Sequence, residues 1–143
     1  MERVAEHALG IAELCGATVH SLYVVDETAY RTIPDDAREQ VRDTLTDDGE
    51  SATKAIAERT LERGLETRRE VRWGNPAAAI IAYAIENEID LIVTGTRGKT
   101  GFERYMLGSV AEKVVRSSPI AVLTVNIGDT DELLADVEGL IGT

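Results

Sequence analysis

The most informative segment of this 143-residue chain runs from Leu91 to Ser109 and reads LIVTGTRGKTGFERYMLGS. Its glycines Gly95, Gly98 and Gly108 stand at the spacing G-x2-G-x9-G and follow a short apolar run that is typical of a buried strand. Glycine lets backbone N–H groups approach an anion without a side chain in the way. This pattern therefore predicts a phosphate-binding loop between a strand and a helix of an α/β sheet.

Two anion-binding elements are expected in this segment. Gly95 and Gly98 would form the first at the end of the strand, and Gly108 and Ser109 would begin a helix whose free N–H groups form the second. The Ser109 hydroxyl would add a donor. The alternative is that Ser109 and Glu112 form a capping box, which needs no ligand.

Positive charges accompany the loop. Arg97, Lys99 and Arg104 lie close together in a chain whose formal net charge is −11, which favours an anionic ligand over plain solvated loop cations, although for Arg104 the two interpretations are balanced. The segment does not fit a Walker A loop, because Val93 stands where that motif requires its first glycine. The dinucleotide fingerprint G-x-G-x-x-G is also absent, so a hydride-transfer enzyme has no support.

Composition indicates one soluble globular domain, with 43% hydrophobic residues and no apolar run near the roughly 20 residues that a membrane helix needs. The acidic charge opposes binding to nucleic acid or to anionic membranes, and together with the preference for arginine over lysine it is typical of salt-loving organisms. Cys15 is the single cysteine, so we expect a small core residue in a reducing cytoplasm.

Strands and helices alternate along the chain, which predicts an α/β fold with an open parallel sheet and helices on both faces. The domain is expected over 1–125, followed by an acidic amphipathic tail over 126–143. The expected helices span 1–15, 35–63 (which Gly49 could break or bend), a segment that begins at Asn75 and Pro76, and 109–116; the expected strands span 17–25, 67–73 (an edge strand), 89–94 and 120–125.

Few side chains suggest catalysis. His7 and His20 have no carboxylate or cysteine at ligand spacing, and we expect them to be structural. Trp73 is expected to pack at the core or rim rather than to stack on a ligand. In the helix after Pro76, an apolar face is predicted to point inward, comprising Ala77, Ile80, Ile81, Ala84 and Ile85.

Residues 94–125 resemble the ATP-binding signature of the universal stress proteins, from the glycine spacing to the ending SSPIAVLTV. The resemblance continues in LYVVDE at residues 22–27 and in GNPAAAIIAYAIENEIDLIVTG at residues 74–95. It implies a five-stranded parallel sheet in the order 3-2-1-4-5, a homodimer through the last strand (Ile120 to Val125), and ATP or AMP, with or without Mg²⁺. By position it implies phosphate and ribose contacts from Gly95, Gly98, Gly108 and Ser109, a backbone N–H from Val110, and an adenine contact from Val24.

The chain departs from that family at its start. The family begins with an apolar strand that ends in an aspartate and a serine, whereas Met1 here falls within the first helix. The strands that end at Val25 and Thr94 would then close on each other, leave a gap, or borrow a strand. We expect a misassigned start codon or a shortened chain; the alternative is a native short form with reduced affinity for ATP.

Three functions remain. The favoured one is a stress-response module in which ATP or AMP shifts the conformation or the dimer. The second is a ligand-free homodimeric adaptor that has lost nucleotide binding. The third is an ATPase or phosphotransferase that uses Mg²⁺, with Ser109 or Thr100 as phospho-acceptor, although no catalytic base is evident.

Overall fold

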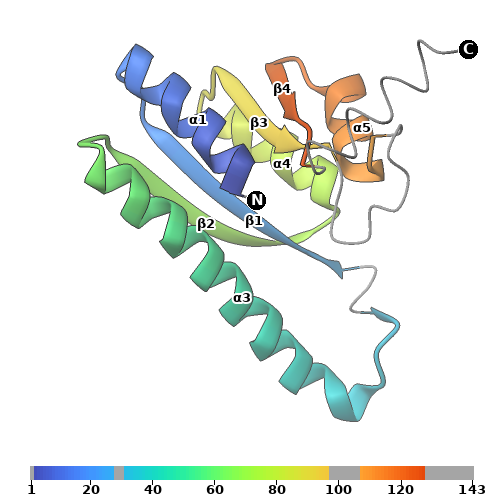
Figure 1. Ribbon diagram of the computed structural model, residues 1–143. Coiled ribbons are helices and arrows are strands. Elements are labelled where there is room, and N and C mark those ends of the chain that lie inside the picture. The colour runs from blue at the N-terminus through green and yellow to red at the C-terminus, as the bar shows by residue number, and fades with distance from the viewer. Residues whose placement is uncertain (1, 28–30, 97–106, 128–143) are drawn as a thin grey trace, which may run out of the picture.

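Helices and strands alternate along the chain in the computed structural model, which describes residues 2–27, 31–96 and 107–127 (Figure 1). Most of the predicted tail, residues 128–143, therefore lies outside the described residues. No helix within the described ranges is long and apolar enough to cross a membrane. The elements are α1 (Glu2–Cys15), β1 (Val19–Asp26), α3 (Asp35–Glu62), β2 (Thr67–Gly74), α4 (Pro76–Glu86), β3 (Leu91–Gly95), α5 (Ser109–Ser117) and β4 (Ala121–Val125).

The strands form two parallel pairs. β1 pairs with β2 from Val19 opposite Thr67 onward, and β3 pairs with β4 from Leu91 opposite Ala121 onward. Among the described residues, no ladder joins β1 to β3, so the sheet is divided into two two-stranded sheets. The predicted α/β fold with parallel strands is confirmed, and it is realised here as two pairs rather than one continuous sheet.

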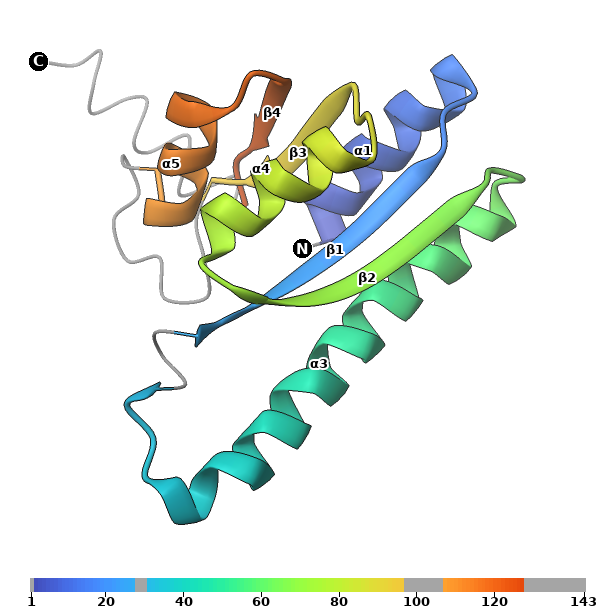
Figure 2. The ribbon, with the colours of Figure 1, turned by 180° about the vertical axis from the view of Figure 1, so that it is seen from behind.

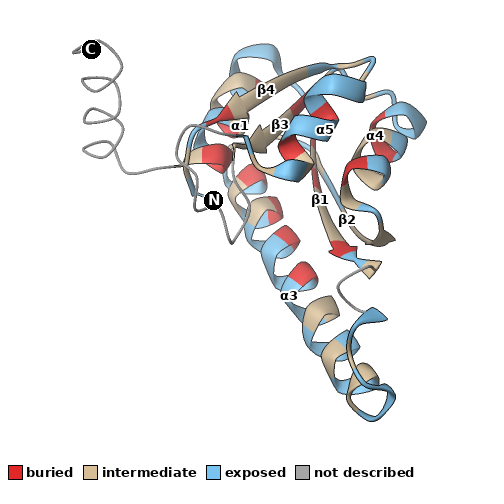
Figure 3. Cartoon of the chain, turned by 90° about the vertical axis from the view of Figure 1, so that its right-hand side faces the viewer, coloured by how far each residue is buried: buried red, intermediate tan, exposed pale blue. Residues whose placement is uncertain are grey.

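Helices cover both faces of the strands (Figures 1 and 2). On one face α1 and α3 pack against β1, with Leu9 and Ala12 next to Val19. On the other face α4 and α5 pack against β3, with Ala84 and Val114 next to Ile92. Leu9 and Val114 have no exposed surface, and the buried residues in Figure 3 concentrate where helices meet strands. The fold therefore has two small cores, one on each face of the strands.

The single long helix predicted over 35–63 is confirmed as α3, and it runs without interruption through Gly49, the position at which the sequence left a break or bend open. Gly49 is buried against β1 and β2, and a Cβ built at this position would lie 2.8 Å from Tyr23 Cδ1 and 3.0 Å from Val71 Cγ1. The glycine is therefore explained by close packing of the helix on the strands rather than by a change in helix direction.

The predicted helix ends are confirmed at two places. Gly16 has φ +64° just after α1, and the Asn75 side chain accepts a hydrogen bond of 3.1 Å from the Ala78 N–H at the start of α4. Two predictions of burial are wrong. Cys15 is exposed, because it lies in the last turn of α1 beyond the contact with β1, and Ile85 is 55% exposed.

Candidate functional site

The glycine-rich segment brings the end of β3 next to the start of α5. Gly95, the last residue of β3, pairs with Val125 in β4. The next residue, Thr96, donates its N–H to the Val125 oxygen at 2.9 Å and accepts the Gly108 N–H at 2.5 Å. The first and third glycines of the motif, thirteen positions apart in sequence, are thus linked through one residue.

In the part of the chain that the structure describes, no side chain caps the start of α5. Gly108 is the N-cap residue in an extended conformation (φ −61°, ψ 157°), and its oxygen accepts the Glu112 N–H at 2.9 Å. The alternative of a capping box at Ser109 is therefore wrong: the N-cap is Gly108, Ser109 is already helical, and the Glu112 carboxylate pairs with Arg116. Among the described residues, no side chain caps the free N–H groups of this first turn.

The structure places the other predicted ligand residues as follows. Ser109 is exposed at the first position of α5, and Val110 is half-buried against the core beneath the helix. Val24 lies in β1, opposite Arg72 of β2 and therefore in the other sheet. Arg97, Gly98 and Lys99 lie outside the described residues. The structure thus brings together Gly95, Gly108, Ser109 and Val110, while Val24 belongs to the other two-stranded sheet.

The α4-facing side of β1 carries a polar contact that the sequence did not predict. His20 Nδ1 lies 2.7 Å from the Tyr83 hydroxyl, and the Arg72 guanidinium stacks on the Tyr83 ring at 4.9 Å from its centroid. Burial, and then the charge of Arg68, lower the pKa of His20, whereas burial, followed by the charge of Glu70, raises the pKa of Tyr83. His20 is thus a structural residue, as predicted, that joins β1 to α4.

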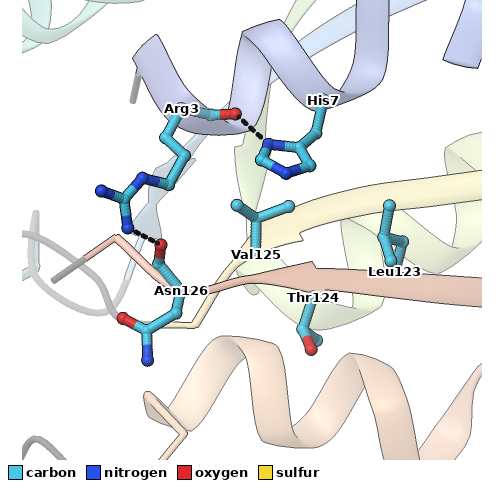
Figure 4. A pocket seen from close by; sticks show the side chains of 6 residues that line it. All are labelled: Arg3, His7, Leu123, Thr124, Val125 and Asn126. Carbon is cyan, nitrogen blue, oxygen red and sulfur yellow. Dashed lines mark hydrogen bonds between the residues drawn. The ribbon is translucent and has the colours of Figure 1, made fainter. Parts of the chain in front are cut away.

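An open pocket of about 460 Å³ lies between α1 and β4, at the carboxyl end of β4 (Figure 4). Arg3 reaches across it and donates to the Asn126 oxygen at 3.0 Å, and His7 Nδ1 donates to the Arg3 oxygen at 2.8 Å. The floor is formed by residues of β4, including Val125. Arg3 therefore brings a positive charge to the carboxyl end of β4, where the Val125 oxygen accepts the Thr96 N–H.

The described residues contain no group of three or more histidine, cysteine or carboxylate side chains that could hold a metal ion. The sequence did not predict the contacts made by Thr96, Arg3 and Tyr83. Thr96 had a signal, since it lies inside the G-x2-G spacing. Arg3 and Tyr83 had none, because their partners are distant in sequence.

Comparison with known proteins identifies the family of the chain. The family model of the universal stress protein family matches residues 1–126. A universal stress protein of Methanocaldococcus jannaschii is 38% identical over 122 residues, which cover 85% of this chain and 72% of the relative. UspA from Lactobacillus plantarum has a similar structure, with a TM-score of 0.72, 28% identity, and coverage of 87% of this chain and 88% of UspA.

A further solved structure is a universal stress protein in complex with cAMP. It has a TM-score of 0.62 and 22% identity, and the match covers 88% of this chain and 86% of that protein, so this likeness concerns the fold alone. The family match over nearly the whole described chain, together with the relative in Methanocaldococcus, is decisive. The chain belongs to the universal stress protein family.

Proposed function

We propose that this chain binds ATP or AMP, with or without Mg²⁺, at the start of α5, and that the nucleotide shifts the conformation or the dimer of a cytoplasmic stress-response protein. The observation that carries the proposal is the first turn of α5, which lies beside the end of β3 and which no described side chain caps. Ser109 and Val110 present helix N–H groups there, and the helix dipole favours a negative charge. A family member in complex with cAMP adds support for a nucleotide as the ligand class.

The geometry also indicates which backbone N–H groups at the start of α5 are available to a phosphate. The Gly108 N–H already donates to Thr96, so the phosphate would be bound by the N–H groups that follow it, with the Ser109 hydroxyl beside them. Gly108 would then serve mainly by its missing side chain, which leaves the approach to the helix open. Arg97, Gly98 and Lys99 remain predicted contributors from the loop.

The experiment compares ATP and AMP binding, by equilibrium dialysis with and without Mg²⁺, in the wild type, Gly108→Val and Leu107→Val. The backbone of Gly108 suits any residue, so valine should leave the fold intact while its branched Cβ obstructs the phosphate. Leu107 is 38% exposed and adjacent, so its variant controls for a change in the same segment. Equal binding by all three would reject the site, and no binding by the wild type would favour the ligand-free adaptor.

We further propose that the place between β1 and β3 belongs to a central strand, since the described strands form two separate two-stranded sheets. Backbone groups in a parallel ladder alternate between its two sides. Val19 donates to Glu66 beside β2, so His20, Leu22 and Val24 turn their N–H and C=O groups away from β2. In the same way, the Thr96 N–H donates toward β4, so the backbone N–H and C=O groups of Val93, three residues earlier, turn away from β4. Both pairs thus turn a row of donors and acceptors away from their partners, and such a strand would complete the sheet order that the resemblance implies.

This strand would carry apolar side chains on both faces, because α1 lies on one side and α4 on the other. The test adds a synthetic peptide of alternating valine and isoleucine that ends in aspartate and serine, with terminal lysines for solubility. Binding with a raised thermal midpoint is expected. The same peptide with a central proline is the control, since proline removes a ladder donor; equal effects of both peptides, or none, would contradict the proposal.

Homodimerisation through residues 120–125 is also part of the proposal. β4 is an edge strand among the described residues, and Ala121 is exposed on it. Light scattering of the purified protein is expected to give twice the mass of 15.5 kDa. A proline at Thr124, whose N–H turns away from β3 because that of Val125 turns toward it, should shift that mass toward the monomer; an unchanged mass would contradict pairing through this edge.

A further inference from the structure

The pocket between α1 and β4 combines an apolar floor with a positive charge. Leu123 and Val125 point from β4 toward α1, whereas Thr124 points to the opposite side of the strand (Figure 4). Arg3 and His7 line the pocket from α1, and Arg3 supplies a guanidinium. A surface of this kind suits a segment that is both apolar and acidic.

The surface continues along α1. Four residues at the spacing i, i+4, i+7 and i+11 share one stripe of this helix, called here the α1 stripe: Arg3, His7, Gly10 and Leu14. A Cβ built at Gly10 meets no described atom within 4 Å, and Leu14 is 89% exposed. The α1 stripe is therefore positive at the amino end of the helix, open in the middle and apolar at the carboxyl end.

The rest of the predicted tail, residues 128–143, lies outside the described residues, and its sequence is complementary to this surface. It reads GDTDELLADVEGLIGT, with five side-chain carboxylates and no lysine or arginine. Three of the five carboxylates precede Leu133. Leu133, Val137 and Leu140 stand at i, i+4 and i+7, a spacing that predicts one apolar face of a helix. Acidic residues thus come first and apolar residues later, in the order that matches the α1 stripe.

The point at which the chain leaves β4 lies at the positive end of the α1 stripe. The Arg3 guanidinium donates to the Asn126 oxygen there, at 3.0 Å. A helix over residues 128–143 would be about 24 Å long, and α1, with 14 residues, is about 21 Å long. A tail that turns back after Asn126 can therefore follow the α1 stripe from Arg3 to Leu14. Its first acids would then meet Arg3 and the positive end of the α1 dipole.

We propose that residues 128–143 dock as an amphipathic helix on the α1 stripe and on the pocket beside β4 of their own chain. Charge complementarity and length favour this occupant. Its attachment at Asn126 also gives it a high effective concentration at the pocket, which a separate protein does not have. The docked helix covers Leu14 and the floor of the pocket, and the proposal does not depend on nucleotide binding.

The single cysteine makes a direct test possible. Cys15 is exposed and follows Leu14, so it carries a nitroxide spin label without any substitution. In the full-length ¹⁵N-labelled chain, the nitroxide should broaden the amide signals of Leu140 and Ile141 far more than that of Asp129, because the docked tail ends near Leu14. Signal intensities before and after reduction of the nitroxide measure the broadening. Equal broadening of all three signals, or none, would overturn the proposal.

Two charge reversals form a matched pair. Arg3→Glu replaces the attraction for the first acids by repulsion and should weaken docking about two- to fivefold, with recovery of the Leu140 signal. Lys113→Glu makes the same change of charge at an exposed position of α5, on the other face of the strands, and should keep the broadening. Equal effects of both variants, or no effect of Arg3→Glu, would overturn the proposal.

Two leucine variants test the apolar contact without altering Arg3. Leu14→Gln should also recover the Leu140 signal, whereas Leu61→Gln, at a position 61% exposed in the last turn of α3, should not. A mixture of spin-labelled chain without ¹⁵N and unlabelled ¹⁵N chain identifies the chain on which the tail docks. Unchanged tail signals are expected in this mixture, and broadening there would mean docking on a second copy and overturn the proposal.

Discussion

Replacing Gly49 by alanine should destabilise the protein, although alanine is the better helix former. In a helix interior alanine is favoured over glycine by about 1 kcal/mol. At Gly49, however, the new Cβ would lie 2.8 Å from Tyr23 Cδ1 and 3.0 and 3.1 Å from the two methyl groups of Val71. All three are closer than carbon atoms normally approach, and overpacking of this kind costs about 1–3 kcal/mol. The net loss of unfolding free energy is therefore about 0–2 kcal/mol.

Gly10→Ala is the matched control. Gly10 lies inside α1, and a Cβ built there meets no atom within 4 Å, so the variant should gain about 0.5–1 kcal/mol from helix propensity alone. Urea denaturation followed by helical circular dichroism measures both variants against the wild type. If Gly49→Ala were as stabilised as Gly10→Ala, the account of α3 packed tightly on β1 and β2 would be refuted.

Three further outcomes are expected. The fold lowers the pKa of His20, so near and below the ordinary histidine pKa of 6.5 the unfolded chain binds more protons than the folded one, and stability falls as the pH drops through that value. The urea midpoints of the wild type and His20→Gln should therefore converge on acidification. A difference between the two midpoints that stays constant with pH would contradict this. Asn75→Ala removes the cap of α4 and should cost about 1 kcal/mol in urea denaturation, whereas no change would mean that the cap contributes nothing. Glu6→Gln removes the negative charge that pairs with Arg63, whose hydrogen bond holds the Glu6 pKa low. The thermal midpoint should therefore fall at low salt and equal the wild-type value at high salt, and a loss that does not depend on salt would exclude an ion-pair origin.

The sequence predicted what depends on local patterns. Alternating periodicity located all eight described elements to within a few residues, and the αL glycine after Cys15 and the Asn75 cap were correct because both are local backbone chemistry. The edge position of β2 followed from its charged residues in the same way. In the glycine motif, Gly95 and Gly108 lie close together, as expected of a segment that joins the end of a strand to the start of a helix.

Contacts between distant segments could not be predicted from patterns. Ile85 fits the apolar stripe of α4 in the sequence, but in the structure Ile85 is exposed and Tyr83 is buried. The Tyr83 hydroxyl forms a hydrogen bond with His20, 63 positions away, which no local pattern reveals. The sequence left open whether Gly49 interrupts its helix, because only the folded structure places Tyr23 against this glycine. The Ser109 capping box was wrong by one residue, since the hydrogen bond between Thr96 and Gly108 fixes where α5 begins.

The most direct test of nucleotide binding at α5 follows individual backbone amides by ¹⁵N NMR while ATP is added. We predict that the amide signals of Ser109 and Val110 shift with saturation, because their N–H groups would bind phosphate at the uncapped helix start. The amide of Gly10, inside α1 on the opposite face of the strands, should stay in place. ATP that binds without moving Ser109 or Val110, or that moves no signal at all, would contradict the account.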